Sequence, residues 1–186
     1  MKNKILITGT GRSGTSFLMR LFTHLGMDTG FTKKQSDMFV DNKQNAGLEN
    51  LNLHTDNRIH KAPHFAEMID DINEKFKIDH VIVPMRDLYK SAKSRESVGG
   101  LNSAGGLWKA NNLEEQIIHN SKLFYNLIYD LTKNNIKYSI LHFPNIVYDY
   151  NEIYKPLSWL FDEYGITEEV FKVKHDKIKD LKKIRI

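Results

Sequence analysis

The chain of 186 residues lacks cysteine altogether and has no long apolar run. The lack of cysteine excludes a disulfide framework, a thiolate metal site and a cysteine nucleophile. The apolar stretch near the N-terminus is too short for a signal peptide or a membrane span, and no other stretch is long enough. There is also no internal repeat and no low-complexity tract. We therefore expect a soluble, cytoplasmic protein that folds around an apolar core.

The length and the charge of the chain indicate how many domains it has and which ligands it suits. A chain of this length predicts one domain over residues 1–186 with no long linker. Its 27 Lys and Arg against 23 Asp and Glu give a formal net charge of +4. This excess fits an anionic ligand, although a lysine-rich surface would also produce it. Six lysines and one arginine gather in residues 172–185, where we expect a solvated helix face rather than a binding patch. We expect neither a nucleic acid nor a membrane as partner.

Apolar segments of two kinds alternate along the chain. Short apolar runs predict strands, and longer stretches with apolar residues at helical spacing predict helices. The expected strands are residues 4–8, 58–61, 80–86 and 137–143, and the expected helices are residues 17–25, 65–76, 87 onward, 113–133 and 156–164. The alternation predicts an α/β protein: a three-layer fold with a central parallel sheet of about four or five strands flanked by helices. Polar segments 27–57 and 97–112 are expected to be loops that carry function.

A glycine-bearing turn separates the first strand from the first helix. Glycines allow a tight turn and let backbone N–H groups approach an anion, while the positive end of the following helix dipole faces the same point. The spacing from Gly9 to Gly14 is that of a P-loop, but Thr15 stands where the lysine of such a loop would follow. Arg12 can supply the missing cation as a planar guanidinium. The turn is therefore predicted to hold a phosphate or a sulfate.

A second anion contact is predicted at a neighbouring strand end. Arg86 and Asp87 end the run 80–86, and Ser94 follows eight positions after Arg86. In a helix, eight residues make a little over two turns, so Ser94 returns to roughly the face of Arg86. Ligands of such sheets bind at the carboxyl ends of the strands. A guanidinium and a hydroxyl that converge there are suited to a second phosphate.

Both segments resemble motifs of one family. Gly11, Arg12, Ser13, Gly14, Thr15 and Ser16 resemble the 5′-phosphosulfate loop of the P-loop sulfotransferases, and Arg86 with Ser94 resembles their 3′-phosphate motif. The likeness extends over residues 4–165 in overall order, with only the two motifs specific. It implies transfer of a sulfuryl group from 3′-phosphoadenosine 5′-phosphosulfate (PAPS) to a hydroxyl or amine of a small-molecule or glycan acceptor. Such a ligand needs two anion sites and no bound metal.

Sulfuryl transfer is an in-line displacement that needs cations near the leaving oxygen. Arg12 and the N–H groups of the loop are the first candidates. Lys61, Ala62 and Pro63 resemble the Lys-x-Pro element of members that act on carbohydrates, which makes Lys61 the second cation and a carbohydrate the preferred acceptor. The alternative reading of Lys61 is an ordinary surface lysine.

The acceptor must also lose a proton to a base. Residues 45–49 resemble the Gly-x-Glu or Gly-x-x-Glu stretch of many bacterial members, and Glu49 is therefore the predicted base. His64 is the second candidate because cytosolic members place a histidine just after such a lysine, and His54 and His60 lie close by. Any single one of these histidines is also compatible with an ordinary half-buried or surface position.

Two rival functions remain open. A P-loop kinase for a nucleotide or small metabolite would use Arg12 in place of lysine, but Arg86 at the strand end would repel magnesium, with Asp87 as a weak counter-argument. A non-catalytic protein would keep the nucleotide cradle and lack the base. Trp108 and Lys109 partly resemble a Gly-x-Trp-Lys nucleotide contact but come too early in the chain, so we expect a loop over acceptor or nucleotide. The adenine site stays unassigned.

Overall fold

The computed structural model describes residues 3–40, 46–98 and 105–184. Its centre is a sheet of four parallel strands in the order β2-β1-β3-β4. β1 (Lys4–Ile7) lies between β2 (Ile59–Lys61) and β3 (Ile78–Met85), and β4 (Tyr138–His142) pairs with the outer side of β3. Three of the four strands fall within the runs expected from the sequence, while β3 begins two residues before the expected run 80–86. The parallel sheet confirms the α/β prediction.

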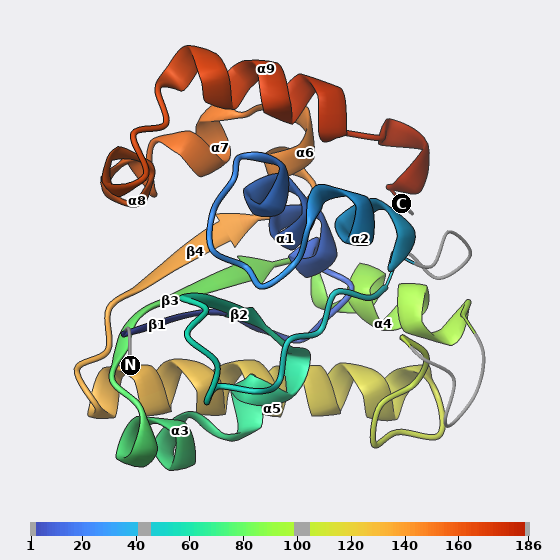
Figure 1. Cartoon of the computed structure of the whole chain (residues 1–186). Helices are drawn as coiled ribbons and strands as arrows, with labels where there is room; N and C mark the ends of the chain where they lie inside the picture. The colour runs from blue at the N-terminus through green and yellow to red at the C-terminus, as the bar shows by residue number, and fades with distance from the viewer. Residues whose placement is uncertain (1–2, 41–45, 99–104, 185–186) are drawn as a thin grey trace.

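Helices cover both faces of this sheet (Figure 1). One layer contains α1, α6, α7, α8 and α9, and the opposite layer contains α3 and α5. In chain order the helices are α1 (Thr15–His24), α2 (Lys33–Met38), η1 (Pro63–Glu67), α3 (Ile69–Lys75), α4 (Leu88–Glu96), α5 (Leu113–Lys133), α6 (Asn145–Tyr148), α7 (Asn151–Tyr154), α8 (Ser158–Glu163), α9 (Glu168–Ile178) and η2 (Leu181–Lys183). None of the helices in the described residues has the length and apolarity needed to cross a bilayer.

The alternation of side chains along β1 explains the two layers. Ile5 and Ile7 pack into the core on the α1 side, and Leu6 packs into the core on the α5 side. All four residues of β1 are buried, because successive side chains in a strand point to opposite faces and both faces are covered. The continuous apolar run of the sequence is thus a central strand that is enclosed on both sides.

Three of the expected elements differ in detail. The polar segment 27–57, expected to be irregular, contains the short helix α2, which begins with a capping box between Thr32 and Gln35. The helix expected over residues 65–76 is divided into η1 and α3 at Met68, whose side chain is 44% exposed instead of sharing the apolar face. The helix expected over residues 156–164 is the shorter α8.

Candidate active site

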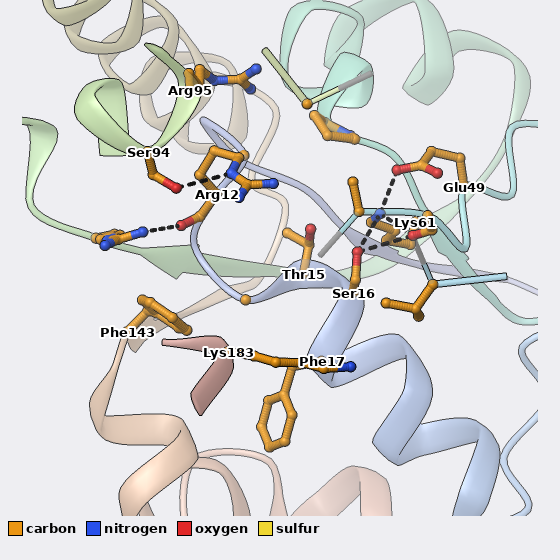
Figure 2. A pocket seen from close by; sticks show the side chains of 18 of the residues that line it. Arg12, Thr15, Ser16, Phe17, Glu49, Lys61, Ser94, Arg95, Phe143 and Lys183 are labelled. Carbon is orange, nitrogen blue, oxygen red and sulfur yellow. Dashed lines mark hydrogen bonds and ion pairs between the residues drawn. The ribbon is translucent and has the colours of Figure 1, made fainter. Parts of the chain in front are cut away.

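A pocket of about 950 Å³ opens beyond the carboxyl ends of the strands. Residues from the turn after β1, from the segments after β2, β3 and β4, and from the C-terminal segment line its wall. Figure 2 shows Arg12 and Ser94 on one side of the pocket, Lys61 and Glu49 on another, and Phe143 below. A parallel sheet is expected to hold its ligand at this edge.

The turn between β1 and α1 has a backbone that glycine makes possible. Gly11 and Gly14 have φ values of 74° and 91°, and a Cβ at Gly14 would lie 2.8 Å from Cδ2 of Phe143. Arg12 also has a positive φ of 56°. Gly14 is the N-cap of α1 and provides no side-chain hydrogen bond to it. The N–H groups of the first turn of α1 are therefore left for an anion at the helix N-terminus.

Ser13 belongs to this turn. Its side chain is fully buried, and no hydrogen-bond partner of Oγ lies within the described part of the chain. A buried hydroxyl without a partner is unfavourable. Ser13 is not among the residues that line the pocket, so its predicted contact with an anion stays a prediction.

Arg12 brings the two predicted motifs together. Its Nε donates to Oγ of Ser94 at 3.2 Å, and its backbone carbonyl accepts a hydrogen bond of 3.0 Å from Nη1 of Arg86. The guanidinium of Arg86 lies 5.2 Å from the ring centre of Phe143. Burial lowers the pKa of Arg86, and the charge of Asp87 opposes this effect. Arg86 and Ser94 thus meet at Arg12, and the two motifs form one cationic site.

Asp87 has a structural contact of its own. Its Oδ1 accepts a hydrogen bond of 2.8 Å from the backbone N–H of Lys90, which makes Asp87 the N-cap of α4. The carboxylate that was the weak counter-argument for magnesium therefore accepts a hydrogen bond at the start of a helix.

Lys61 and Glu49 form the second half of the site. Nζ of Lys61 donates to Oε1 of Glu49 at 2.6 Å, to the carbonyl of Gly47 at 2.7 Å and to Oγ of Ser16 at 3.2 Å. Lys61 is 1% exposed, so its interpretation as an ordinary surface lysine is wrong. Burial lowers the pKa of Lys61, and the carboxylate of Glu49 opposes this effect. Lys61 therefore joins the predicted base to the first turn of α1.

The three histidines lie in different places. His64 is exposed, lines the pocket and packs against Trp108 with ring centres 5.0 Å apart. His60 is fully buried with Nε2 at 2.9 Å from the carbonyl of Asn57, and burial lowers its pKa. His54 packs against Phe76. Of the three, His64 is the one that the structure brings to the described pocket wall.

Several pocket residues were not predicted from the sequence. Arg95, next to Ser94 on α4, is buried and lines the pocket. Phe17 and Phe143 also line it. Lys183 also lines it, so the expectation of a purely solvated face for residues 172–185 is wrong there; Arg185 lies outside the described residues. Polar side chains occupy nearly every position of α4, so the sequence carried no signal that set Arg95 apart.

Two expected loops are only partly described. Asn45 lies outside the described residues, which resume at Ala46. Residues 99–104 of the predicted loop 97–112 also lie outside them. Its described part, with Gly105, Leu107, Trp108 and Lys109, lines the pocket. Gly105 lies next to Arg12 of the turn after β1, and the folding of this loop over a ligand stays a prediction.

The chain thus has an α/β fold with a parallel sheet, a glycine turn after β1 and a pocket at the carboxyl ends of the strands. A search of solved structures found similarity to one described as the sulfotransferase domain from the curacin biosynthetic pathway. The TM-score is 0.52 with 14% sequence identity, over 92% of this chain and 76% of that chain. No protein-family model and no curated protein sequence matches the chain. The similarity establishes the fold.

Proposed function

We propose that this protein is a PAPS-dependent sulfotransferase that acts on a hydroxyl or amine of an acceptor. The observation that carries the proposal is the convergence on one pocket of the glycine turn with Arg12 and of the Lys61–Glu49 pair. The first group suits an anion, and the second supplies a cation and a base. The sulfotransferase-type fold supports the same assignment.

The nucleotide would occupy the cationic side of the pocket. Residues Gly11 to Ser16 would hold the phosphosulfate, with the N–H groups at the start of α1 as donors. Arg86 and Ser94 would hold the 3′-phosphate beside Arg12. A volume of about 950 Å³ lies within the range of roughly 300–1,000 Å³ that binds small ligands.

Glu49 would act as the base. Its side chain is 39% exposed and lines the pocket, so an acceptor that enters from solvent can reach the carboxylate. As the acceptor oxygen or nitrogen forms its bond to sulfur, its proton passes to Glu49. The bond from sulfur to the bridging phosphate oxygen breaks, and that oxygen keeps the electron pair in the 3′,5′-ADP product.

Arg12 and Lys61 would stabilise the charge that grows during this step. Negative charge increases on the bridging oxygen, and cations held in place before the reaction stabilise it most. The hydrogen bond from Lys61 to Ser16 places its ammonium at the start of α1, close to the predicted phosphosulfate site. We propose small molecules and glycans as acceptors, with carbohydrates as the first class to test, since Lys61 and Glu49 resemble residues of members that act on them.

Calorimetric titration with 3′,5′-ADP, and separately with ATP and magnesium, tests this proposal. We expect binding of 3′,5′-ADP in the micromolar range without metal and little binding of ATP. The opposite preference would favour a P-loop kinase with Arg12 in place of lysine. Tight binding of 3′,5′-ADP without transfer to any acceptor in a broad screen would favour a non-catalytic binding protein.

A further inference from the structure

Arg95 lies outside both motifs but is the most enclosed arginine of the site. It follows Ser94 on α4, lines the pocket and is 5% exposed. Figure 2 shows it on the same side of the pocket as Arg12 and Ser94. A buried guanidinium is costly unless hydrogen bonds compensate for the loss of water. The partners of Arg95 therefore indicate why a cation is held there.

Two of these partners belong to segments far apart in the sequence. Nη2 of Arg95 donates to the carbonyl of Thr10 in the turn after β1, and Nη1 donates to the carbonyl of Gly106, both at 2.8 Å. The guanidinium also lies 5.2 Å from the ring centre of Trp108. A Cβ at Gly11 would overlap Nη2, so glycine is required for this approach. Arg95 thus joins the anion-binding turn to the pocket wall that carries Trp108.

Arg95 is one of three side chains that hold successive carbonyls of the turn. The carbonyl of Thr10 is held by Arg95, that of Gly11 by Oγ of Ser91 at 3.1 Å, and that of Arg12 by Arg86. In a trans peptide, the carbonyl and the following N–H point in opposite directions. Fixing these carbonyls therefore directs the next three N–H groups away from the side chains that hold them. Successive N–H groups held in this way form anion-binding concavities.

We propose that Arg95 and Ser91 are positioning residues for the bound phosphosulfate, an inference that rests on the proposed function. They fix the Thr10 and Gly11 carbonyls so that the following N–H groups are available to the anion before it binds. Through Gly106 and Trp108, Arg95 also joins the adjacent part of the pocket wall to the same turn. Neither residue needs to touch the reacting atoms for this role.

The charge of Arg95 agrees with this role. Burial, followed by the nearby charge of Arg12, lowers its pKa to about 10, so the guanidinium stays charged at neutral pH. Two neighbouring guanidinium groups repel each other, and an anion in the turn reduces this repulsion. The guanidinium groups of Arg12 and Arg95 are therefore more stable side by side when an anion is bound in the turn.

Comparison of two nucleotides tests the proposal. Variants Ser91→Ala and Arg95→Lys are titrated with 3′,5′-ADP and with adenosine 3′-monophosphate, which lacks the 5′-phosphate that the turn would hold. We expect about a 10-fold or greater loss of affinity for 3′,5′-ADP and little change for the monophosphate, since the loss concerns hydrogen bonds to a charged group. The control is Lys93→Gln, an exposed position on α4, which should bind both as the parent does. Equal losses for both nucleotides, or no loss, would overturn the proposal.

Trp108 offers a readout that a purely structural role would not change. The chain has two tryptophans, and Trp159 packs against His80 instead of lining the described pocket wall. In a Trp159→Phe background, 3′,5′-ADP should change the emission of Trp108, and Arg95→Lys should abolish that change. A lower thermal midpoint with an unchanged response to nucleotide would mean that Arg95 only stabilises the fold.

The two proposals can fail separately. If the parent protein binds ATP or inorganic pyrophosphate but shows no preference for 3′,5′-ADP, the sulfotransferase assignment fails, and the same variants are compared with pyrophosphate. A loss confined to Ser91→Ala and Arg95→Lys would still support the positioning role. If the parent binds none of these anions, the turn is not an anion site and the positioning proposal fails as well.

Discussion

At the scale of single residues, replacement of Glu49 tests most directly which side chain acts as the base. We expect Glu49→Gln to lower kcat by at least about 100-fold, because glutamine keeps an oxygen that can accept from Lys61 but cannot take a proton. Affinity for 3′,5′-ADP should stay within about twofold, since glutamine still accepts from Lys61 and the contact of Lys61 with Ser16 is kept. Steady-state kinetics with a responsive acceptor and calorimetry of the same preparation measure the two effects.

His64→Gln is the matched variant for this experiment. His64 lines the same pocket and is the second candidate for the base. It should keep most of the activity if Glu49 takes the proton. The reverse pattern, with activity lost in His64→Gln and retained in Glu49→Gln, would transfer the role to His64.

Predictions from the sequence are least accurate for side chains whose partners lie far away along the chain. The types of Arg12, Arg86 and Ser94 and their spacing point to anions, and these residues do meet at one place. The burial of Lys61 was not predictable, because its partners Ser16 and Glu49 come from other segments. A residue's neighbours along the chain indicate its chemistry, but its burial depends on how distant segments pack.

At the scale of elements, α4 connects stability to the site. Asp87 caps this helix, and the helix carries Ser91, Ser94 and Arg95. We expect Asp87→Ala to lower the free energy of unfolding by about 1 kcal/mol. It should also weaken binding of 3′,5′-ADP severalfold, because the first turns of α4 position the side chains that hold the glycine turn. Urea unfolding and calorimetry provide the two measurements.

Thr167→Ala provides the control at this scale. Thr167 caps α9 by accepting from the N–H of Val170. Loss of this cap should also lower stability but leave nucleotide affinity unchanged. If both variants weakened binding equally, the effect of Asp87 would be a general loss of stability and not a local effect of α4.

The strands were easier to predict than the helices between them. Continuous apolar runs such as residues 4–8 are a local signal for strands buried on both faces, and β1 and β3 follow it. The division between η1 and α3 was not predictable from apolar spacing, since Met68 fits the periodic pattern but is exposed. The short α2 was missed because its capping signal at Thr32 and Gln35 lies in a polar segment.

At the scale of the whole molecule, parallel strands explain why the site could be located from sequence. All four strands point the same way, so the segments after β1, β2, β3 and β4 meet at one edge. Motifs that follow two buried strands therefore had to lie near each other. The C-terminal segment had no such constraint, and the position of Lys183 on the pocket wall depends on how α9 packs over α1. Packing of this kind has no local signature.

A buried histidine in β3, His80, makes the stability of the fold depend on pH. His80 in β3 is 6% exposed, with Nε2 at 2.9 Å from Oγ of Ser139 and its ring 4.9 Å from that of Trp159. Burial, followed by the charge of Lys137, lowers its pKa from 6.5 to about 4, while Asp79 opposes this shift. The folded protein therefore keeps His80 neutral at pH values where the unfolded chain binds a proton.

Acidification should consequently destabilise the fold. Between about pH 6.5 and about pH 4 the unfolded state binds more protons, so the free energy of unfolding falls by up to about 1.4 kcal/mol per pH unit for this histidine. His80→Gln keeps a polar partner for Ser139 but cannot titrate, and its stability should depend less steeply on pH in this interval. Urea unfolding followed by tryptophan fluorescence gives both curves. Parallel curves for parent and variant would show that His80 is not the source, and the other buried histidines, His60 and His175, whose pKa values are lowered by burial, would be changed next.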